Sequence, residues 1–135
     1  MAVLTTQRHR GIQPFAFALR AVIVGLTLAT AAIHVSLGGM LFLMNAIGYA
    51  GLALVLVLPG PFARLRWLSR YALIGFTAVT VVAWLAFGAR FDLAYLDKGI
   101  EVALIGVVLL ESWVIDGGPL AVARRAVRTA GSIVR

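Results

Sequence analysis

Four apolar stretches, at residues 17–37, 41–58, 71–88 and 98–115, constrain the fold of this chain more than any other feature. Each is about as long as the roughly 17 to 25 residues that a helix needs to cross a hydrocarbon layer about 30 Å thick. The charge content agrees, because 13% of the residues are charged, against about 25% in ordinary soluble domains. The sequence therefore predicts an integral membrane protein.

The connections between these stretches are short. Gly38 and Gly39 join the first two, residues 59–70 join the second and third, and residues 89–97 join the third and fourth. Connections this short make neighbouring helices run antiparallel. We therefore expect an all-α fold, a bundle of four transmembrane helices in up-down-up-down order, followed by a short C-terminal amphipathic surface helix.

The basic residues predict the orientation. The chain has 12 lysines and arginines, and all but Arg90 and Lys98 fall before or at the start of the first span, in the second connection, or after the fourth span. Because lysine and arginine accumulate in cytoplasmic loops, we expect both termini in the cytoplasm. The residues on that side are Arg8, Arg10, Arg20, Arg64, Arg66, Arg70, Arg124, Arg125, Arg128 and Arg135.

This orientation divides the chain into a cytoplasmic basic N-terminal segment (1–16), a transmembrane domain (17–117) and a basic amphipathic tail (118–135). An alternative for the N-terminal region is a cleavable secretory signal, with Ala29 and Ala31 as small residues at the cleavage site. The apolar run exceeds the roughly 7 to 15 residues of a signal core, so we favour a membrane span.

Several function classes are disfavoured. The net charge of +7 is explained by the topology, and no basic patch interleaved with aromatic residues remains to bind nucleic acid. The chain has no cysteine, and it lacks His-Glu-x-x-His, Gly-rich phosphate-loop and Gly-x-Ser-x-Gly motifs. We therefore expect a protein that is not an enzyme and that has no cofactor and no metal site.

Polar residues within the spans form a predicted layer near the outer boundary. His34 lies near the outer end of the first span, Asn45 near the start of the second and Glu101 near the start of the fourth, each about 5 Å inside by the helical rise. Asp97 and Lys98 lie just above. These five residues are the candidate site for a polar ligand or a proton relay, since ionisable groups are costly in hydrocarbon. The alternative is an interhelical hydrogen-bond network that only fixes the packing.

A second pair is predicted at the inner face, where Arg20 and Glu111 lie at similar depth and could form an ion pair. Alternatively, Arg20 reaches lipid phosphates and Glu111 meets Arg124 or water. Small residues at 46–51 and 99–106 predict that the second and fourth helices pack tightly, within one chain or between copies. The threonines within the spans are expected to donate to the carbonyl one turn back; they are Thr27, Thr30, Thr77 and Thr80.

The tail is predicted to lie on the inner membrane surface. Leu120, Ala123 and Val127 share one face of a helix, and the arginines lie opposite, a pattern typical of a helix attracted to anionic lipid. A disordered basic tail is the alternative. The predicted contacts with the lipid surface are Arg124, Arg125 and Arg128.

Two segments, residues 40–51 (MLFLMNAIGYAG) and 95–105 (YLDKGIEVALI), resemble an uncharacterised group of small four-helix bacterial membrane proteins. The resemblance implies a bacterial inner-membrane protein and no particular activity. We carry two function hypotheses. The first is a non-catalytic accessory or assembly subunit with a membrane-protein partner or a second copy. The second is a small transporter or channel for a cation, a proton or a small polar solute.

Overall fold

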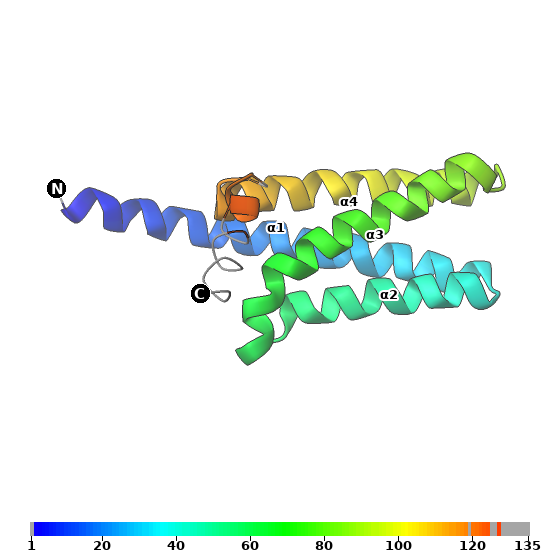
Figure 1. Ribbon diagram of the computed structural model, residues 1–135, viewed down its shortest axis with the longest axis horizontal. Helices are drawn as coiled ribbons and strands as arrows, with labels where there is room; N and C mark the ends of the chain where they lie inside the picture. The colour runs from blue at the N-terminus through cyan, green and yellow to red at the C-terminus, as the bar shows by residue number, and fades with distance from the viewer. Residues whose placement is uncertain (1, 119, 125–126, 128–135) are drawn as a thin grey trace.

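The computed structural model describes the backbone of residues 2–118, 120–124 and 127, and side chains from Pro14 onward within these ranges. Its described part is all-helical and contains no strand, which confirms the all-α part of the prediction. Four long helices and one short 3-10 helix follow one another (Figure 1). They are α1 (Ala2–Leu37), α2 (Met40–Val57), the 3-10 helix η1 (Gly60–Leu65), α3 (Arg66–Phe87) and α4 (Asp92–Asp116).

The long helices lie side by side and run in alternating directions (Figure 1). The α1–α2 and α3–α4 connections share one end, here called the turn end, and η1 and the end of α4 share the other, here called the terminal end. Helices α1 and α3 each pack against both α2 and α4. Within the described chain, no Cα atoms of α1 and α3, or of α2 and α4, lie within 8 Å of each other, so each of these pairs lies on a diagonal.

The diagonal placement of α2 and α4 shows that their predicted tight packing within one chain is wrong. Gly99, Ala103 and Gly106 all lie on the exposed side of α4. A Cβ atom added at Gly99 or Gly106 would meet nothing within 4 Å. On α2, Gly48 instead packs against Phe76 of α3, whose Cζ atom would lie 2.7 Å from an added Cβ.

Three helices begin earlier than the apolar stretches predicted. Helix α1 begins at Ala2 rather than 17 and contains Pro14, so residues 2–16 are not separated from the first span by a break. Helix α3 begins at Arg66 after η1, and α4 begins at Asp92 rather than 98. Hydropathy marks only the part of a helix suited to hydrocarbon, whereas backbone hydrogen bonding continues until a residue leaves the helical conformation.

Glycines and one proline end the helices. Gly38 and Gly39 have φ of 71° and 82°, a left-handed conformation that glycine adopts without steric cost. Leu58 is extended, as expected for a residue before proline, and ends α2.

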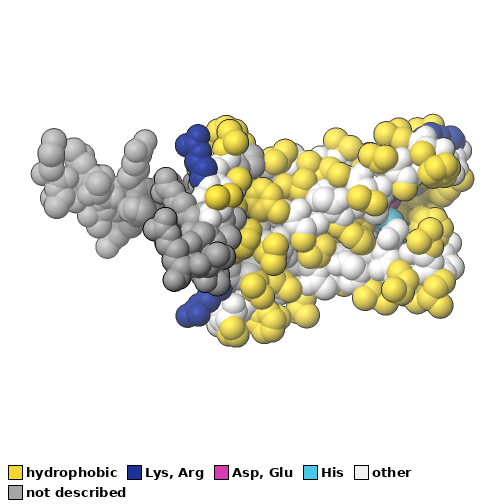
Figure 2. All heavy atoms as spheres, viewed as in Figure 1, with side chains coloured by type: hydrophobic (Ala, Val, Ile, Leu, Met, Phe, Trp, Pro, Cys, Tyr) yellow, Lys and Arg dark blue, Asp and Glu magenta, His cyan; other side chains and the backbone are white. Residues whose placement is uncertain are grey.

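Three segments are long and apolar enough to cross a membrane: Pro14–Leu37, Met40–Val57 and Gly60–Phe87. Helix α4 does not meet the same composition criterion. It carries Asp97, Glu101 and Glu111, all of which are buried against the other helices. Apolar side chains cover much of the outside of the helices (Figure 2), as expected for a membrane protein.

Candidate functional site

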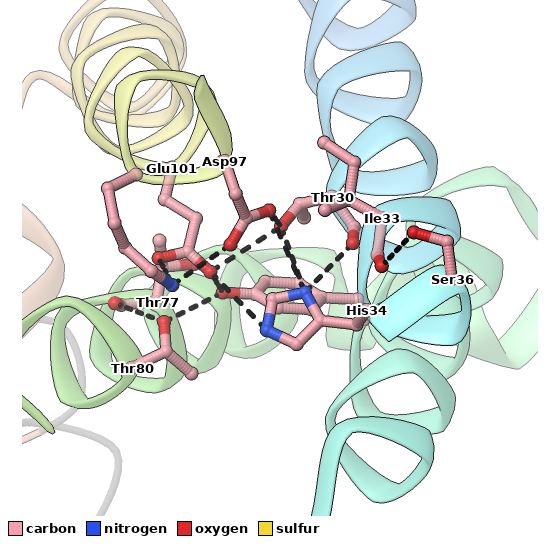
Figure 3. Close-up of polar contacts among 10 residues, drawn as sticks. Thr30, Ile33, His34, Ser36, Thr77, Thr80, Asp97 and Glu101 are labelled. Carbon is pink, nitrogen blue, oxygen red and sulfur yellow. Dashed lines mark hydrogen bonds and ion pairs between the residues drawn. The ribbon is translucent and has the colours of Figure 1, made fainter. Parts of the chain in front are cut away.

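Polar side chains of α1, α2 and α4 meet inside the bundle, and Thr80 of α3 joins them through Tyr49, whose hydroxyl lies 3.0 Å away (Figure 3). Thr30 and His34 are four residues apart on one face of α1, and Asp97 and Glu101 are four apart on the facing side of α4. The side chains of His34, Asp97 and Glu101 are at most 2% exposed. We call this group the polar cluster; its members are Thr30, His34, Tyr49, Asp97, Lys98 and Glu101.

Lys98 bridges the two carboxylates of the polar cluster. Its Nζ atom lies 3.0 Å from Asp97 Oδ2 and 2.6 Å from Glu101 Oε2. Two carboxylates four residues apart on one helix repel each other, and the ammonium group between them offsets that repulsion. Its charge balances one of the two negative charges, not both.

Two hydroxyl groups complete the hydrogen bonding of the carboxylates. Thr30 Oγ1 donates to Asp97 Oδ1 at 2.6 Å, and Tyr49 Oη donates to Glu101 Oε1 at 2.8 Å. Tyr49 is fully buried, and its ring meets Phe76 edge-on at 4.9 Å between centroids. Although α2 and α4 are diagonal, the long tyrosine side chain reaches across the centre of the bundle to connect them.

His34 has one ring nitrogen engaged and one available. Its Nδ1 atom donates to the backbone carbonyl of Thr30 at 2.9 Å; a carbonyl can only accept, so Nδ1 carries the hydrogen. The Nε2 atom lies 3.9 Å from Glu101 Oε1 and makes no hydrogen bond within the described part of the chain. A second proton would therefore bind at Nε2, facing a carboxylate.

A cleft of about 460 Å³ opens above the polar cluster. Figure 2 shows a hollow near the turn end with histidine visible inside it. His34, Asp97 and Lys98 line the cleft at its polar side, as do Asn45 and Thr80. Its other walls are mainly apolar and aromatic: Leu37, Leu41, Phe42, Val79, Ala83, Trp84, Phe87, Phe91 and Ala94.

The structure thus brings four of the five predicted site residues into direct contact. Asn45 lines the cleft but makes no hydrogen bond with the cluster in the described chain. Thr30 and Tyr49 were missed. We expected Thr30 to donate to the carbonyl one turn back, but it donates to Asp97 instead. Thr27 follows the prediction and donates to the Ile23 carbonyl, at 2.7 Å.

Thr30 lies four residues before His34, and residues four apart on a helix are neighbours. This spacing could have indicated that Thr30 shares the face of α1 that is turned to the site. No sequence signal placed Tyr49 there.

The donor set also suits a metal ion, although the sequence predicted no metal ligand. His34, Asp97 and Glu101 each offer a ligand atom, and these atoms lie within 4.8 Å of one another. Imidazole and carboxylate groups together bind zinc and similar divalent ions. Lys98, however, already places a positive charge against both carboxylates, which opposes a divalent cation.

A second charged group lies at the terminal end. Arg20 Nε is 3.3 Å from Oε1 of the fully buried Glu111. Arg70, which the sequence pattern assigned only to the connection, also lies inside, with its guanidinium 3.7 Å from Glu111 and 2.7 Å from Asp116. Two arginines therefore face two carboxylates, and the charges of this group balance.

The three arginines predicted to contact lipid fall at the edge of the described chain. Arg124 is exposed on a helical segment, while Arg125 and Arg128 lie outside the described residues. Leu120 and Val127, on the predicted apolar face, are 74% and 73% exposed.

Comparison with known proteins assigns no relative. No protein-family model matches the chain, and neither a curated protein nor a solved structure matches it. Its function must therefore be argued from the geometry of the polar cluster and the cleft.

Proposed function

We propose that the chain spans a bacterial inner membrane four times, with α4 as the fourth span and the turn end outside the cytoplasm. Helix α4 has 25 residues, about 37 Å at 1.5 Å per residue, which suffices to cross the hydrocarbon layer. It packs along α1 and α3, which are apolar enough to span. Asp97, Glu101 and Glu111 lower its hydropathy but face the interior, where membrane proteins tolerate charged residues.

Reporter fusions test this topology. A reporter inserted within η1 and one fused after Arg135 should both behave as cytoplasmic, whereas one inserted between α3 and α4 should behave as periplasmic. The expectation follows from the concentration of basic residues at the terminal end. A periplasmic signal from either of the first two positions would refute it.

We infer further that the polar cluster binds one exchangeable positive charge, a proton or a cation, and that the protein is a small transporter or channel for it. A single observation carries this proposal: two buried carboxylates face one ammonium group. Because the side chains of Asp97 and Glu101 are at most 2% exposed, the remaining negative charge is costly unless a proton or a cation offsets it. The cleft supplies access, because His34, Asp97 and Lys98 line it.

Reconstitution into liposomes tests the proposal. An imposed pH or cation gradient should drive flux, read with a trapped pH dye, and Glu101→Gln should abolish the flux because the amide removes the unbalanced charge. His34→Gln should reproduce the defect, because the two groups lie in one site. Asp92→Asn is the matched control, since Asp92 lies exposed on the same helix.

Each variant must first give the circular dichroism spectrum and gel-filtration profile of the parent. A Glu101→Gln protein that folds normally and retains the parent's flux would remove the polar cluster as a functional site.

The alternative function, an accessory or assembly subunit, is supported by a different observation. Gly99, Ala103 and Gly106 form an exposed face on α4 that no other helix of the described chain covers, and such faces let a neighbouring helix approach closely. Co-purification in mild detergent discriminates the two. A stoichiometric partner favours the subunit, whereas a protein that purifies alone and supports flux favours the transporter.

A further inference from the structure

We propose that the cleft binds a monovalent organic cation with an apolar body, and that its binding releases one proton from the polar cluster. This inference rests on the proposed function, the binding of an exchangeable positive charge, and adds the chemical class of the ligand. It combines three independent features: the volume and walls of the cleft, the charge balance at its polar side, and an unengaged nitrogen on His34.

The cleft is too large to serve a bare ion. Its volume of about 460 Å³ falls in the range of small-molecule sites, about 300 to 1,000 Å³. Its walls include Phe42, Trp84, Phe87 and Phe91. Such surfaces stabilise an apolar ligand by burial, and aromatic faces also attract cations. Arg90 already lies over the Trp84 ring, 4.1 Å from its centroid, so the cation attraction is assigned to the phenylalanine rings.

The polar side of the cleft carries the charge that such a cation needs. His34 from α1 and Asp97 and Lys98 from α4 line this side, and α3 contributes the hydroxyl of Thr80. Tyr49 from α2 and Glu101 from α4 are the other titratable groups of the polar cluster, in contact with these residues but not lining the cleft. With His34 and Tyr49 neutral and the other three ionised, the cluster carries one negative charge. The head group of a monovalent cation brings that sum to zero.

His34 gives the same site a proton to exchange. Its Nδ1 hydrogen is committed to the Thr30 carbonyl, so a second proton binds at Nε2, which lies 3.9 Å from Glu101 Oε1. With this proton bound, the cluster is neutral and does not attract a cation. When a cation binds, the proton leaves Nε2 for water, and the total charge of the site is unchanged.

A divalent metal explains fewer of these features. It would use the ligand atoms of His34, Asp97 and Glu101 but would face the Lys98 ammonium, which lies 2.6 Å from Glu101 Oε2. It would also leave the aromatic walls of the cleft without a role. A monovalent organic cation uses both the walls and the single unbalanced charge.

The test compares two probes of nearly identical shape, benzyltrimethylammonium and its uncharged carbon analogue neopentylbenzene. Binding to the purified full-length protein in detergent is followed by tryptophan fluorescence, since Trp84 lines the cleft, and by calorimetry. We expect the cation to bind about tenfold or more tighter than the neutral analogue. We also expect cation binding to release protons, read with a pH dye in weakly buffered solution, because the cation and a proton on His34 Nε2 offset the same negative charge.

Two kinds of variant separate the contribution of the negative charge to binding from that of the cleft volume. Glu101→Gln should remove the preference for the charged probe and its proton release. Ala83→Phe, which fills the cleft without altering the cluster, should weaken binding about tenfold or more by taking the space of the ligand. Leu85→Phe on the same helix is the control, because Leu85 is 57% exposed and does not line the cleft.

Equal binding of both probes, or binding of neither, would overturn the inference. Proton release by Zn²⁺ but not by the organic cation would also overturn it, in favour of a metal site. Proton flux that depends on Glu101 without binding of either probe would leave the proposed function standing and remove only this ligand class. A parent protein that shows neither flux nor binding of the probes would refute both proposals.

Discussion

Replacing Tyr49 by phenylalanine isolates one hydrogen bond of the polar cluster. The substitution keeps the ring that packs edge-on against Phe76 and removes only the hydroxyl, which donates to Glu101 Oε1 at 2.8 Å. The carboxylate keeps Lys98 at 2.6 Å on its other oxygen. The variant should therefore fold, with a specific loss of stability.

Two measured ranges for hydrogen bonds bound the expected loss of stability. Hydrogen bonds to charged groups contribute about 1.5 to 3 kcal/mol in soluble proteins, whereas interhelical hydrogen bonds in membranes average about 0.6 and reach about 1.7 kcal/mol. Tyr49 is fully buried and its acceptor is a carboxylate, so we expect about 1 to 2 kcal/mol, a factor of roughly 5 to 30 in the unfolding equilibrium.

Reversible unfolding with sodium dodecyl sulfate in mixed micelles, followed by circular dichroism, measures this loss. Tyr95→Phe is the matched control, because Tyr95 is 55% exposed and its loss of a hydroxyl should cost less than about 0.5 kcal/mol. In a Glu101→Gln background the effect of Tyr49→Phe should shrink, since the acceptor is then neutral. Equal effects of both tyrosine substitutions, unchanged by Glu101→Gln, would refute the assigned interaction.

Two further predictions concern packing and the terminal end. Gly48→Ala should destabilise the protein by about 1 to 3 kcal/mol, because the new Cβ would lie 2.7 Å from the Phe76 ring. Gly51→Ala, at a site with open space on the same helix, should be neutral or stabilising by up to about 1 kcal/mol; a reversed order in denaturant titrations would contradict the packing. Arg70→Met should cost about 3 kcal/mol by leaving the buried Glu111 and the partly buried Asp116 short of a partner. Arg20→Met should cost less, since Arg20 is 25% exposed, and equal melting temperatures for the two variants would count against a buried role for Arg70.

The chain's own pattern of residues determined much of this architecture. Long apolar runs predict the helices, and short connections rich in glycine and proline predict their alternating directions, because both signals are local. Depth along a helix also follows from sequence, since each residue adds a fixed rise. For that reason the residue pattern alone suffices to assign His34, Asn45 and Glu101 to one layer, with Asp97 and Lys98 just above it.

The lateral arrangement was decided only by the tertiary structure. Sequence did not show that α2 and α4 are diagonal, that Arg70 turns inward, or that Tyr49 crosses the bundle to Glu101. In a soluble protein the polar and apolar faces of a helix indicate which side meets its neighbours. In a membrane protein lipid and core are equally apolar, so hydropathy cannot tell one face from another, and the packing of side chains between helices decides which residues meet.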